Sequence, residues 1–595
     1  MILDLPPDRV RSVILDSSGS DPLPWVNRSP EALQRCISVA FECGLMERID
    51  VELADDQPIP VLPYSGFRQF RRIGDRKNYE SKLFDRRMQM EYASIACLLG
   101  RDKWDYLQDL IWAECESTWW ILPAHEAGPA GNGEPAEGPI DLFSAMMACR
   151  LAVLVKLLGD RLEPEVVDRI RKEIDRRVLT PFIDSRYTFW WKGTTNNWNA
   201  VCNGAVGVAA MLMESNPHRL AEIIADILGS IGLFIDGFTD DGGCTEGPGY
   251  WRFGFGWYVR LAGALYDFTN GQINLMQGEK IKRICRYPLA VNVRRGQDLC
   301  FADASAEGYQ EPLTVQIINR FYDLPELYGL CSLDGNPRIH SYLEALLAAE
   351  ESQPEPVEDA SDYWLPDLQV VKIRAGEVTL AAKAGHNAEH HNHNDIGSFI
   401  VHRGKTFFIT DPGGPVYSKK TFSKRRYESI YCNSLGHSVP VVCGTGQTEG
   451  QEFSGVMQVQ GLNDDPHPKI TLDLTGAYFL PALSSLRREL SADRNDGTVR
   501  ITDRFEFSDV PSALEDVFIT CESPELHDGA SAVAIRSESD GTCLLRAEQA
   551  GTFSIDERRE ESIAESRTGD IIRRLVFTPE TLERTMTLQF SVEWK

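Results

Sequence analysis

A change of hydrophobic period near residue 350 constrains the fold of this chain more than any other feature. From Asn78 to about Ala349, apolar residues recur three and four positions apart, which is the period of amphipathic helices. Beyond an acidic, proline-containing stretch at 350–359, apolar and polar residues alternate, as at 499–507 and 586–594. Alternation of this kind is typical of strands buried on one face. The chain therefore predicts a helical region followed by a β-rich region.

The two regions lead to a specific architecture. Successive helices must bury their apolar faces on one another, as a toroid of helical hairpins, an α-solenoid or a bundle, and the lack of a fixed-length repeat favours the toroid. The β-rich region is expected to form an antiparallel β-sandwich. We therefore predict an α+β multidomain chain with a segment 1–65 packed on an α/α toroid 66–350, a linker 351–365 and a β-sandwich 366–595. The predicted helices include 30–45, 88–99, 104–118, 142–158, 165–178, 201–214, 220–235 and 251–266.

Composition and charge limit the classes of molecule that this protein can bind. The 595 residues carry a formal charge of -27, which disfavours nucleic acid and anionic membranes. A local basic run at 419–426 leaves an anionic ligand open. The fourteen cysteines are scattered without paired spacing, which indicates a reduced interior. Because the N-terminus lacks a leader pattern and no apolar run approaches membrane-spanning length, we expect a cytoplasmic protein, or a periplasmic or secreted one if a leader was trimmed.

The segment 384–399 is the densest in chemistry-bearing side chains. Four of the eleven histidines fall at 386–393, and Asp395 follows them. In an extended segment His391, His393 and Asp395 would point to the same side. Such a row can hold a metal ion, poise a proton acceptor, or do both, whereas a polar turn would only hydrogen-bond its histidines to backbone. Asp411 and His437 follow in strand-like surroundings.

Two stretches of the helical region also suggest a site. Four asparagines at 196–203 surround Trp198, which exceeds what a helix cap requires. Amides can bind a carboxylate, and an indole can stack on a sugar. A glycine-rich loop at 240–249 precedes Tyr250 and carries Glu246, with Arg252 just after it. Trp119 and Trp120 could line a sugar cleft or simply pack in the core.

With these motifs in view, the chain resembles the heparinase II/III-like polysaccharide lyases. The resemblance rests on Asn-Asn-Trp-Asn at 196–199, Glu-Gly-Pro-Gly-Tyr at 246–250, His-Asn-His-Asn-Asp-Ile-Gly-Ser-Phe at 391–399, Asp-Pro-Gly at 411–413, and His437. Members of that family join an α/α toroid to a β-sandwich and cleave uronate-containing polysaccharides by β-elimination. The resemblance therefore implies the same fold and a lyase activity.

The resemblance also implies residue roles. It matches Tyr250 and His391 to the catalytic residues and Asn197, or else Asn196, to the residue that neutralises the uronate carboxylate. It implies a structural divalent metal, usually zinc with manganese as an option, and no organic cofactor. The metal ligands that it implies are His393, Asp411 and His437.

The expected chemistry fits these residues. A proton next to a carboxylate is weakly acidic, so amides must stabilise the developing charge before a base removes it. Tyr250, near an imidazole and Arg252, could be ionised enough to take the C5 proton and return it to the C4 oxygen. Some relatives place a histidine in the first motif, where this chain has only asparagine and tryptophan, which leaves the uronate epimer open. The residues expected to bind substrate are Asn196, Trp198, Glu246, Arg252, Trp119, Trp120, Arg425 and Arg426.

The expected partner is an anionic uronate-containing poly- or oligosaccharide, such as heparan sulfate, chondroitin, hyaluronan or alginate. The oligomeric state stays open, with a homodimer as one option. Two other classes compete with a lyase. A glycoside hydrolase could use Asp240, Asp241 and Glu246 as paired carboxylates, but then the histidine run has no role. A non-catalytic carbohydrate-binding protein would use the tryptophans to stack on sugars.

Overall fold

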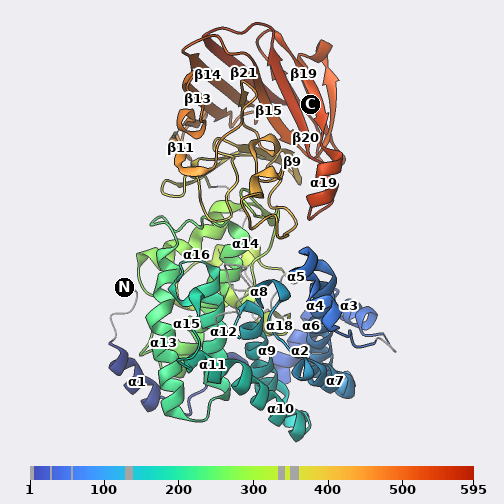
Figure 1. The fold of residues 1–595 in the computed structure, drawn as a ribbon, viewed down its shortest axis with the longest axis vertical. Coiled ribbons are helices and arrows are strands. Elements are labelled where there is room, and N and C mark those ends of the chain that lie inside the picture. The colour runs from blue at the N-terminus through green and yellow to red at the C-terminus, as the bar shows by residue number, and fades with distance from the viewer. Residues whose placement is uncertain (1–5, 27–29, 55–57, 127–138, 333–341, 349–360) are drawn as a thin grey trace. The chain divides into compact units, whose positions relative to one another are not determined.

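The computed structural model describes residues 6–26, 30–54, 58–126, 139–332, 342–348 and 361–595. The chain divides into two compact units (Figure 1). The helical unit comprises Met1–Phe238, Trp251–Lys282 and Tyr309–Pro356, and the β unit comprises Thr239–Tyr250, Arg283–Gly308 and Val357–Lys595. Two segments that precede the change of period thus belong to the β unit. The acidic stretch 350–359 and most of the predicted linker lie outside the described residues, and 363–365 are already part of a strand.

The predicted helices end close to the observed ends, but α6, Lys77–Leu98, begins eleven residues before the predicted start at Met88. Asp141 and Ser144 form a capping box at the start of α9, and the Asn216 side chain caps α13 ahead of Pro217. The helices of this unit are α1 Pro7–Asp16, α2 Pro30–Glu42, α3 Leu45–Glu52, α4 Tyr64–Phe67, α5 Gln69–Ile73, α6 Lys77–Leu98, α7 Trp104–Glu116, α8 Pro123–Glu126, α9 Leu142–Leu158, α10 Pro164–Ile174, α11 Thr180–Ile183, α12 Asn197–Met213, α13 Pro217–Asp236, α15 Gly256–Phe268, α17 Pro312–Phe321 and α18 Tyr342–Ala348.

Contacts between these helices close into a ring. In order around the ring, α6 contacts α7, α7 contacts α10, α10 contacts α9, α9 contacts α12, α12 contacts α15, α15 contacts α17, α17 contacts α18, and α18 returns to α6. An open solenoid would leave its first and last helices apart. The toroid that the sequence predicts is therefore present.

One helix corrects an expectation about apolar length. The segment Leu142–Arg161, which is α9 and the turn after it, is long and apolar enough to cross a bilayer by length and composition, with a hydropathy of 1.8. In the part of the chain that the structure describes, it is the one segment that meets these criteria. However, 61% of the apolar stretch within this segment is buried inside the structure, and α9 packs on α12. A core helix meets the same criteria, and α9 has that position.

The β unit contains antiparallel sheets. A nine-stranded sheet has the order β16-β17-β18-β21-β14-β13-β12-β11-β7, a five-stranded sheet β4-β5-β6-β8-β9, a four-stranded sheet β10-β15-β20-β19, and a small sheet β1-β2-β3. The strand bounds are β1 Asn292–Arg294, β2 Gly296–Asp298, β3 Glu307–Gly308, β4 Tyr363–Leu365, β5 Val370–Ala375, β6 Val378–Lys383, β7 Gly385–Asn387, β8 Phe399–Arg403, β9 Thr406–Ile409, β10 Val441–Val442, β11 Gly450–Gln460, β12 Lys469–Asp473, β13 Leu483–Ala492, β14 Val499–Phe507, β15 Leu514–Thr520, β16 Ser523–His527, β17 Ala532–Ser537, β18 Gly541–Ala547, β19 Gly551–Glu557, β20 Arg573–Pro579 and β21 Thr585–Trp594. Two more helices, α14 Pro248–Tyr250 and α19 Arg559–Glu565, belong to this unit, and α16 Glu279–Val291 runs from one unit into the other.

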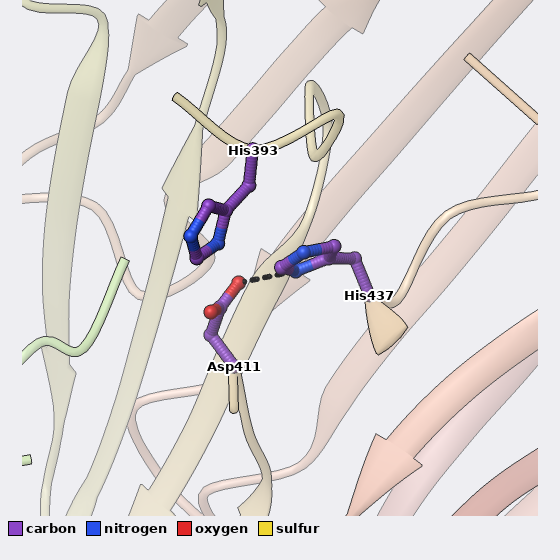
Figure 2. Close-up of side chains that lie close together, drawn as sticks. All are labelled: His393, Asp411 and His437. Atoms are coloured by element: carbon purple, nitrogen blue, oxygen red, sulfur yellow. Dashed lines mark hydrogen bonds and ion pairs between the residues drawn. The ribbon is translucent and has the colours of Figure 1, made fainter. Parts of the chain in front are cut away.

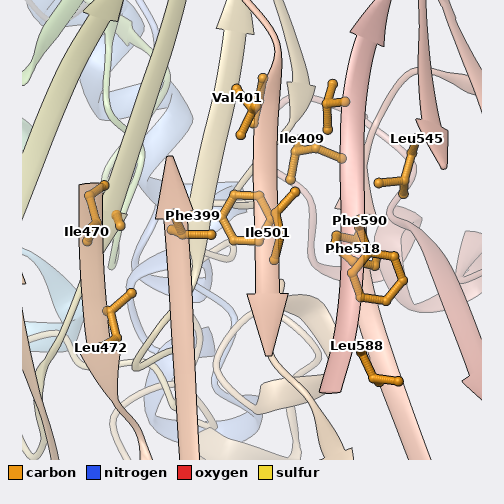
Figure 3. Packing of buried hydrophobic residues seen from close by; sticks show 14 of the residues in the cluster. Phe399, Val401, Ile409, Ile470, Leu472, Ile501, Phe518, Leu545, Leu588 and Phe590 are labelled. Atoms are coloured by element: carbon orange, nitrogen blue, oxygen red, sulfur yellow. The ribbon is translucent and has the colours of Figure 1, made fainter. Parts of the chain in front are cut away.

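The core of the β unit lies between its sheets. Phe399 of β8, Ile501 of β14, Phe518 of β15 and Phe590 of β21 belong to one buried cluster (Figure 3). Strand β14 alternates buried and exposed residues along its length, which is the pattern of a strand with one face on the core. The β-sandwich predicted from the alternation is therefore confirmed.

Candidate active site

The histidine run turns instead of extending. Residues between β7 and β8 form turns, and His391 adopts a φ of 58°, in the left-handed region. The prediction of an extended row with Asp395 is therefore wrong, because a row needs strand dihedrals throughout. Asp395 instead accepts a hydrogen bond from Lys383 at 2.8 Å. The turn directs His391 and His393 to a different carboxylate, Asp303.

Tyr250 lies against His391. Tyr250 is the last residue of α14, and its ring stacks on the His391 imidazole with centroids 4.3 Å apart and planes inclined by 25°. Glu246, buried in the same loop, places its carboxylate 3.7 Å from His391 Nε2. All three residues belong to the β unit, so the predicted meeting of phenol and imidazole occurs within one compact body.

A buried carboxylate that the sequence did not single out holds this group together. Asp303 accepts hydrogen bonds from His391 Nδ1 at 2.6 Å, from His393 Nε2 at 2.9 Å, from the Tyr417 hydroxyl at 2.9 Å and from Arg426 at 2.9 Å. The Tyr417 hydroxyl also lies 2.6 Å from that of Tyr250. The only sequence signal for Asp303 is an acidic residue between two alanines after an apolar run.

The surroundings set the charge of each group. Burial alone would raise the pKa of Asp303, but the hydrogen bonds from His391 and His393 and the charge of Arg426 lower it far below the usual range. Asp303 is therefore a carboxylate that can only accept. Burial also raises the pKa of Tyr250 well above its usual value, and Tyr417 adds to this effect. The expectation of an ionised Tyr250 is therefore wrong, because its phenol keeps its proton near neutral pH.

Because Asp303 can only accept hydrogen bonds, the positions of the protons on His391 and Tyr417 are determined. Because Asp303 only accepts, His391 Nδ1 carries a proton, and Nε2 is left with a lone pair when the imidazole is neutral. The Tyr417 proton likewise points to Asp303, so Tyr417 accepts from Tyr250. The site thus presents an imidazole base beside a protonated phenol.

His393, Asp411 and His437 form a second cluster, and Figure 2 shows their side chains pointing toward one another. All three are buried, and one possible ligand atom from each lies within 4.8 Å of the others. His437 Nδ1 is 2.8 Å from Asp411 Oδ2, while its Nε2 donates to the Tyr431 carbonyl. This set of two imidazoles and a carboxylate can hold a metal ion.

The partners of these imidazoles fit a bound cation. His393 Nε2 donates to Asp303, and its buried Nδ1 has no hydrogen-bond partner among the described residues. Burial lowers the pKa of His393, which favours the neutral ring that a metal requires. Imidazoles that bind metals usually donate their other nitrogen to a carboxylate or carbonyl, as both rings do here.

Of the adjacent Arg425 and Arg426, both predicted to bind substrate, only one turns toward the site. Arg426 is mostly buried and pairs with Asp303, and it also donates to the Asn392 carbonyl. Arg425 is exposed and pairs with Glu428. Arg426 therefore has a structural partner at the centre of the site, whereas Arg425 faces solvent.

In the helical unit, the asparagine run divides into different roles. The Asn196 side chain caps α12 by accepting from Trp198 N, as an ordinary N-cap does. Asn199 and Asn203 are fully buried and bind Ser230 and nearby carbonyls, so they are structural. Asn197, in the first turn of α12, is the amide of the predicted pair that does not serve as the cap.

The tryptophans predicted to bind substrate in the helical unit differ in burial and in their contacts. Trp198 is half-buried and packs on His125 and Trp190, with centroids 4.7 and 4.9 Å away. Trp119 stacks on Phe67 at 4.3 Å. Trp120 is only 2% exposed and donates its indole N–H to the Glu114 carbonyl. The prediction that Trp120 lines a sugar cleft is therefore wrong, because its ring is enclosed in the core.

Arg252 follows Tyr250 in the chain and belongs to the helical unit. It lies in a π-helical turn, Trp251–Phe255, and its side chain is partly exposed. π-Helical turns occur frequently at functional sites.

Comparisons with known proteins find one family match and several structures of similar fold. Residues 359–586 match the family described as heparinase II/III-like, C-terminal. No curated protein matches the chain significantly. Similar solved structures include a heparinase III, with a TM-score of 0.62 and 11% identity over 97% of this chain and 93% of that one.

Two further structures are similar. A mutant heparan sulfate lyase HepC from Pedobacter heparinus has a TM-score of 0.57 and 10% identity over 97% of this chain and 92% of that one. A mutant chondroitin AC lyase from Streptomyces coelicolor A3 has a TM-score of 0.51 and 12% identity over 99% of this chain and 82% of that one. At such identities the likeness concerns the fold, and it agrees with a helical toroid and a β-sandwich in one chain.

Proposed function

We propose that this protein, whose residues 359–586 form a heparinase II/III-like C-terminal domain, is a polysaccharide lyase that cleaves uronate-containing polysaccharides by β-elimination. The observation that carries the proposal is the stacked pair of Tyr250 and His391, with Asp303 fixing the protons. One member of the pair can take a proton and the other can give one. Elimination across two adjacent carbons needs both abilities at one place.

The reaction follows from these protonation states. Elimination removes the C5 proton of a uronate, breaks the bond between C4 and the bridging oxygen, and leaves a C4–C5 double bond. His391 takes the C5 proton on Nε2, since Nδ1 already carries a proton donated to Asp303. Tyr250 gives its proton to the departing C4 oxygen. Each positioned transfer contributes about 10²–10⁴-fold to the rate.

The pair is then restored within the site. After elimination, His391 holds one proton too many and Tyr250 one too few. Because the two rings are stacked, the proton returns from imidazole to phenolate over a short path. The high pKa of Tyr250 favours this return.

The metal in this proposal is structural, and we infer zinc. The ligand set of two imidazoles and one carboxylate is typical of zinc, although ligand type alone also admits manganese. The residues that would hold it are His393, Asp411 and His437. When bound, the ion supplies positive charge that ties three loops together. His393 stands two residues from His391, so a fixed His393 restrains the position of the base.

Recognition of the uronate follows from the amides. The developing charge on the carboxylate needs hydrogen-bond donors in place before the proton leaves. Of the two asparagines that the resemblance matches to this role, we propose Asn197, because Asn196 serves as the cap of α12. The names of the similar structures, which are lyases of heparan sulfate and chondroitin, support an anionic polysaccharide as substrate.

A glycoside hydrolase is the less favoured reading. Asp241, one of its carboxylate candidates, accepts from Thr239 and Gly243 on one oxygen and from the amides of Asp367 and Leu368 on the other. A carboxylate engaged in this way on both oxygens holds loops together and has little capacity left for catalysis. Asp241 is therefore a poor candidate for the acid pair that a hydrolase needs.

A panel of polymers tests the proposal. Heparan sulfate, chondroitin, hyaluronan and alginate are incubated with the wild-type protein and with Tyr250→Phe, and unsaturated uronate is followed by its ultraviolet absorbance. We expect absorbance from at least one polymer and a loss of about 10²-fold or more in Tyr250→Phe. New reducing ends without absorbance would indicate a hydrolase, and binding without any product would indicate a carbohydrate-binding protein.

A further inference from the structure

We propose that Asp303 is a positioning residue that holds the His391 imidazole with its proton on Nδ1, so that Nε2 is the basic nitrogen. This inference rests on the proposed function, since it names a residue that acts through the proposed base. Asp303 lies in the segment Arg283–Gly308, far from His391 in sequence but in the same compact unit.

Four donors converge on the Asp303 carboxylate. Oδ2 lies 2.6 Å from His391 Nδ1 and 2.9 Å from the Tyr417 hydroxyl. Oδ1 lies 2.9 Å from His393 Nε2 and 2.9 Å from an Arg426 nitrogen. The side chain is 0% exposed, so water does not compete for these bonds. A carboxylate offers about four acceptor positions, and here all four are used.

The backbone around Asp303 is equally constrained. Ala302 adopts a φ of 59°, in the left-handed region that residues other than glycine rarely occupy. Arg567 donates to the Asp303 carbonyl at 3.1 Å, and Gly414 N donates to the Ala304 carbonyl at 3.2 Å. A Cβ on Gly414 would lie 2.8 Å from the Asp303 Cα, so only glycine allows this approach. The carboxylate is thus held from both sides of its loop.

This geometry determines one tautomer. Nδ1 of His391 faces a carboxylate that cannot donate, so the neutral ring carries its hydrogen there. The other ring nitrogen, Nε2, points to the side where Glu246 lies 3.7 Å away. An amide in place of Asp303 could turn its NH₂ group toward Nδ1 and stabilise the opposite tautomer. The basic nitrogen would then face the wrong way, as happens when a histidine-orienting aspartate is changed to asparagine in a catalytic triad.

A purely structural role is the competing explanation. Asp303 neutralises the buried Arg426 and supports the metal ligand His393, so its loss could act only through folding or metal content. The two explanations differ in what depends on His391. A positioning residue has no further effect once the imidazole is gone, whereas a structural residue still has one.

The variant Asp303→Asn, purified and assayed at saturating zinc, distinguishes a positioning role from a structural one. We expect kcat to fall about 10²- to 10⁴-fold with KM changed less than about threefold. In the His391→Ala background, the same change should lower kcat by less than about threefold. Asp298→Asn is the matched control, because Asp298 is a buried carboxylate of the same segment that accepts from Asn292. Its kcat should equal that of the wild type.

Nitrogen NMR of histidine-labelled protein gives a readout that does not depend on turnover. The His391 signals, assigned by their loss in His391→Ala, should show Nδ1 protonated in the wild type and the other tautomer in Asp303→Asn. A wild-type ring protonated on Nε2 overturns the proposal even if the variant does not fold. Wild-type kcat in Asp303→Asn at saturating zinc also overturns it. If no polymer yields unsaturated product, the lyase proposal fails while the NMR result still decides the role of Asp303.

Discussion

The Tyr250 hydroxyl lies 2.6 Å from the Tyr417 hydroxyl, and Tyr417 in turn donates to Asp303 at 2.9 Å. Since a hydroxyl has one proton, Tyr417 accepts the hydrogen bond from Tyr250. The proposed acid is thus joined through Tyr417 to the same carboxylate that orients the proposed base. Acid and base share one support, although they come from segments about 140 residues apart in the chain.

Tyr417→Phe should shift the pH dependence of the reaction. Burial is the largest cause of the raised pKa of Tyr250, and the hydrogen bond with Tyr417 raises it further. Without the hydroxyl, the pKa of Tyr250 falls, so the proposed acid loses its proton at a lower pH. We expect kcat at neutral pH to fall about 3- to 10-fold, as for one lost hydrogen bond, and the basic limb of the kcat profile to move to lower pH.

Tyr478→Phe serves as the control for this profile. Tyr478 is also buried in the β unit, and its hydroxyl donates to the Pro440 carbonyl. This variant should keep the wild-type profile. An unmoved basic limb in Tyr417→Phe would exclude Tyr417 as a partner of the proposed acid.

Removal of metal should destabilise the protein. An ion bound only by the folded state adds about 2.7 kcal/mol at a hundredfold excess over its Kd, which corresponds to a Tm change of about 5–10 °C for a unit of this size. Thermal unfolding with and without a chelator measures the shift, and elemental analysis identifies the ion. His437→Ala should have the lower Tm and no response to chelator, whereas His467→Ala should respond like the wild type, because His467 is exposed and lies outside the cluster.

The sequence predicts the two folds well because one-sided burial imposes a period on the chain. Strands β14 and β21 carry the alternation found at 499–507 and 586–594, and helix α13 buries residues at helical spacing, such as Leu220, Ile223, Ile227 and Ile231. The prediction of an extended row through His391 is wrong because it also relied on a regular period. A period argument assumes regular dihedrals, and the left-handed φ of His391 breaks the regularity.

The centre of the site could not be read from the sequence. Asp303 and Tyr417 each stand alone among small or unrelated residues, and their importance comes from partners distant in sequence. The asparagines at 196–203 also show that residue type alone does not reveal a role. Asn196 and Asn199 are of one residue type and three positions apart, yet one caps a helix and the other is buried against Ser230. Only tertiary contacts distinguish these roles.

Acid should weaken the helical unit through Glu114. Its burial opposes ionisation, but the charges of Arg87 and Arg86 outweigh this and lower the pKa of Glu114 below the ordinary value of about 4.3. A lowered pKa in the folded state means that the stabilisation is complete above the unfolded pKa and is lost as pH falls through the folded one. Glu114→Gln removes it, at a cost of about 3–5 kcal/mol for a broken buried pair.

The comparison is made at two pH values. Urea midpoints of the wild type and Glu114→Gln should differ most near pH 7 and converge as pH falls below about 4. Glu116→Gln is the control, because Glu116 is an exposed residue of the same helix. A difference that grows on acidification would contradict the sign of the shift.

Gly413→Ala should damage both stability and catalysis. Gly413 has a φ of 65°, and a Cβ there would lie 2.3 Å from the Ala304 carbonyl oxygen. Gly444 is a matched control, since its φ is 72° and a Cβ would meet nothing within 4 Å. Gly444→Ala should therefore cost about 1 kcal/mol for the dihedral alone. Gly413→Ala should cost more and also lower kcat, because the clash moves the loop that carries Asp303. Unfolding midpoints and kcat of both variants provide the test, and equal effects of the two substitutions would show that the close approach of these loops is unimportant.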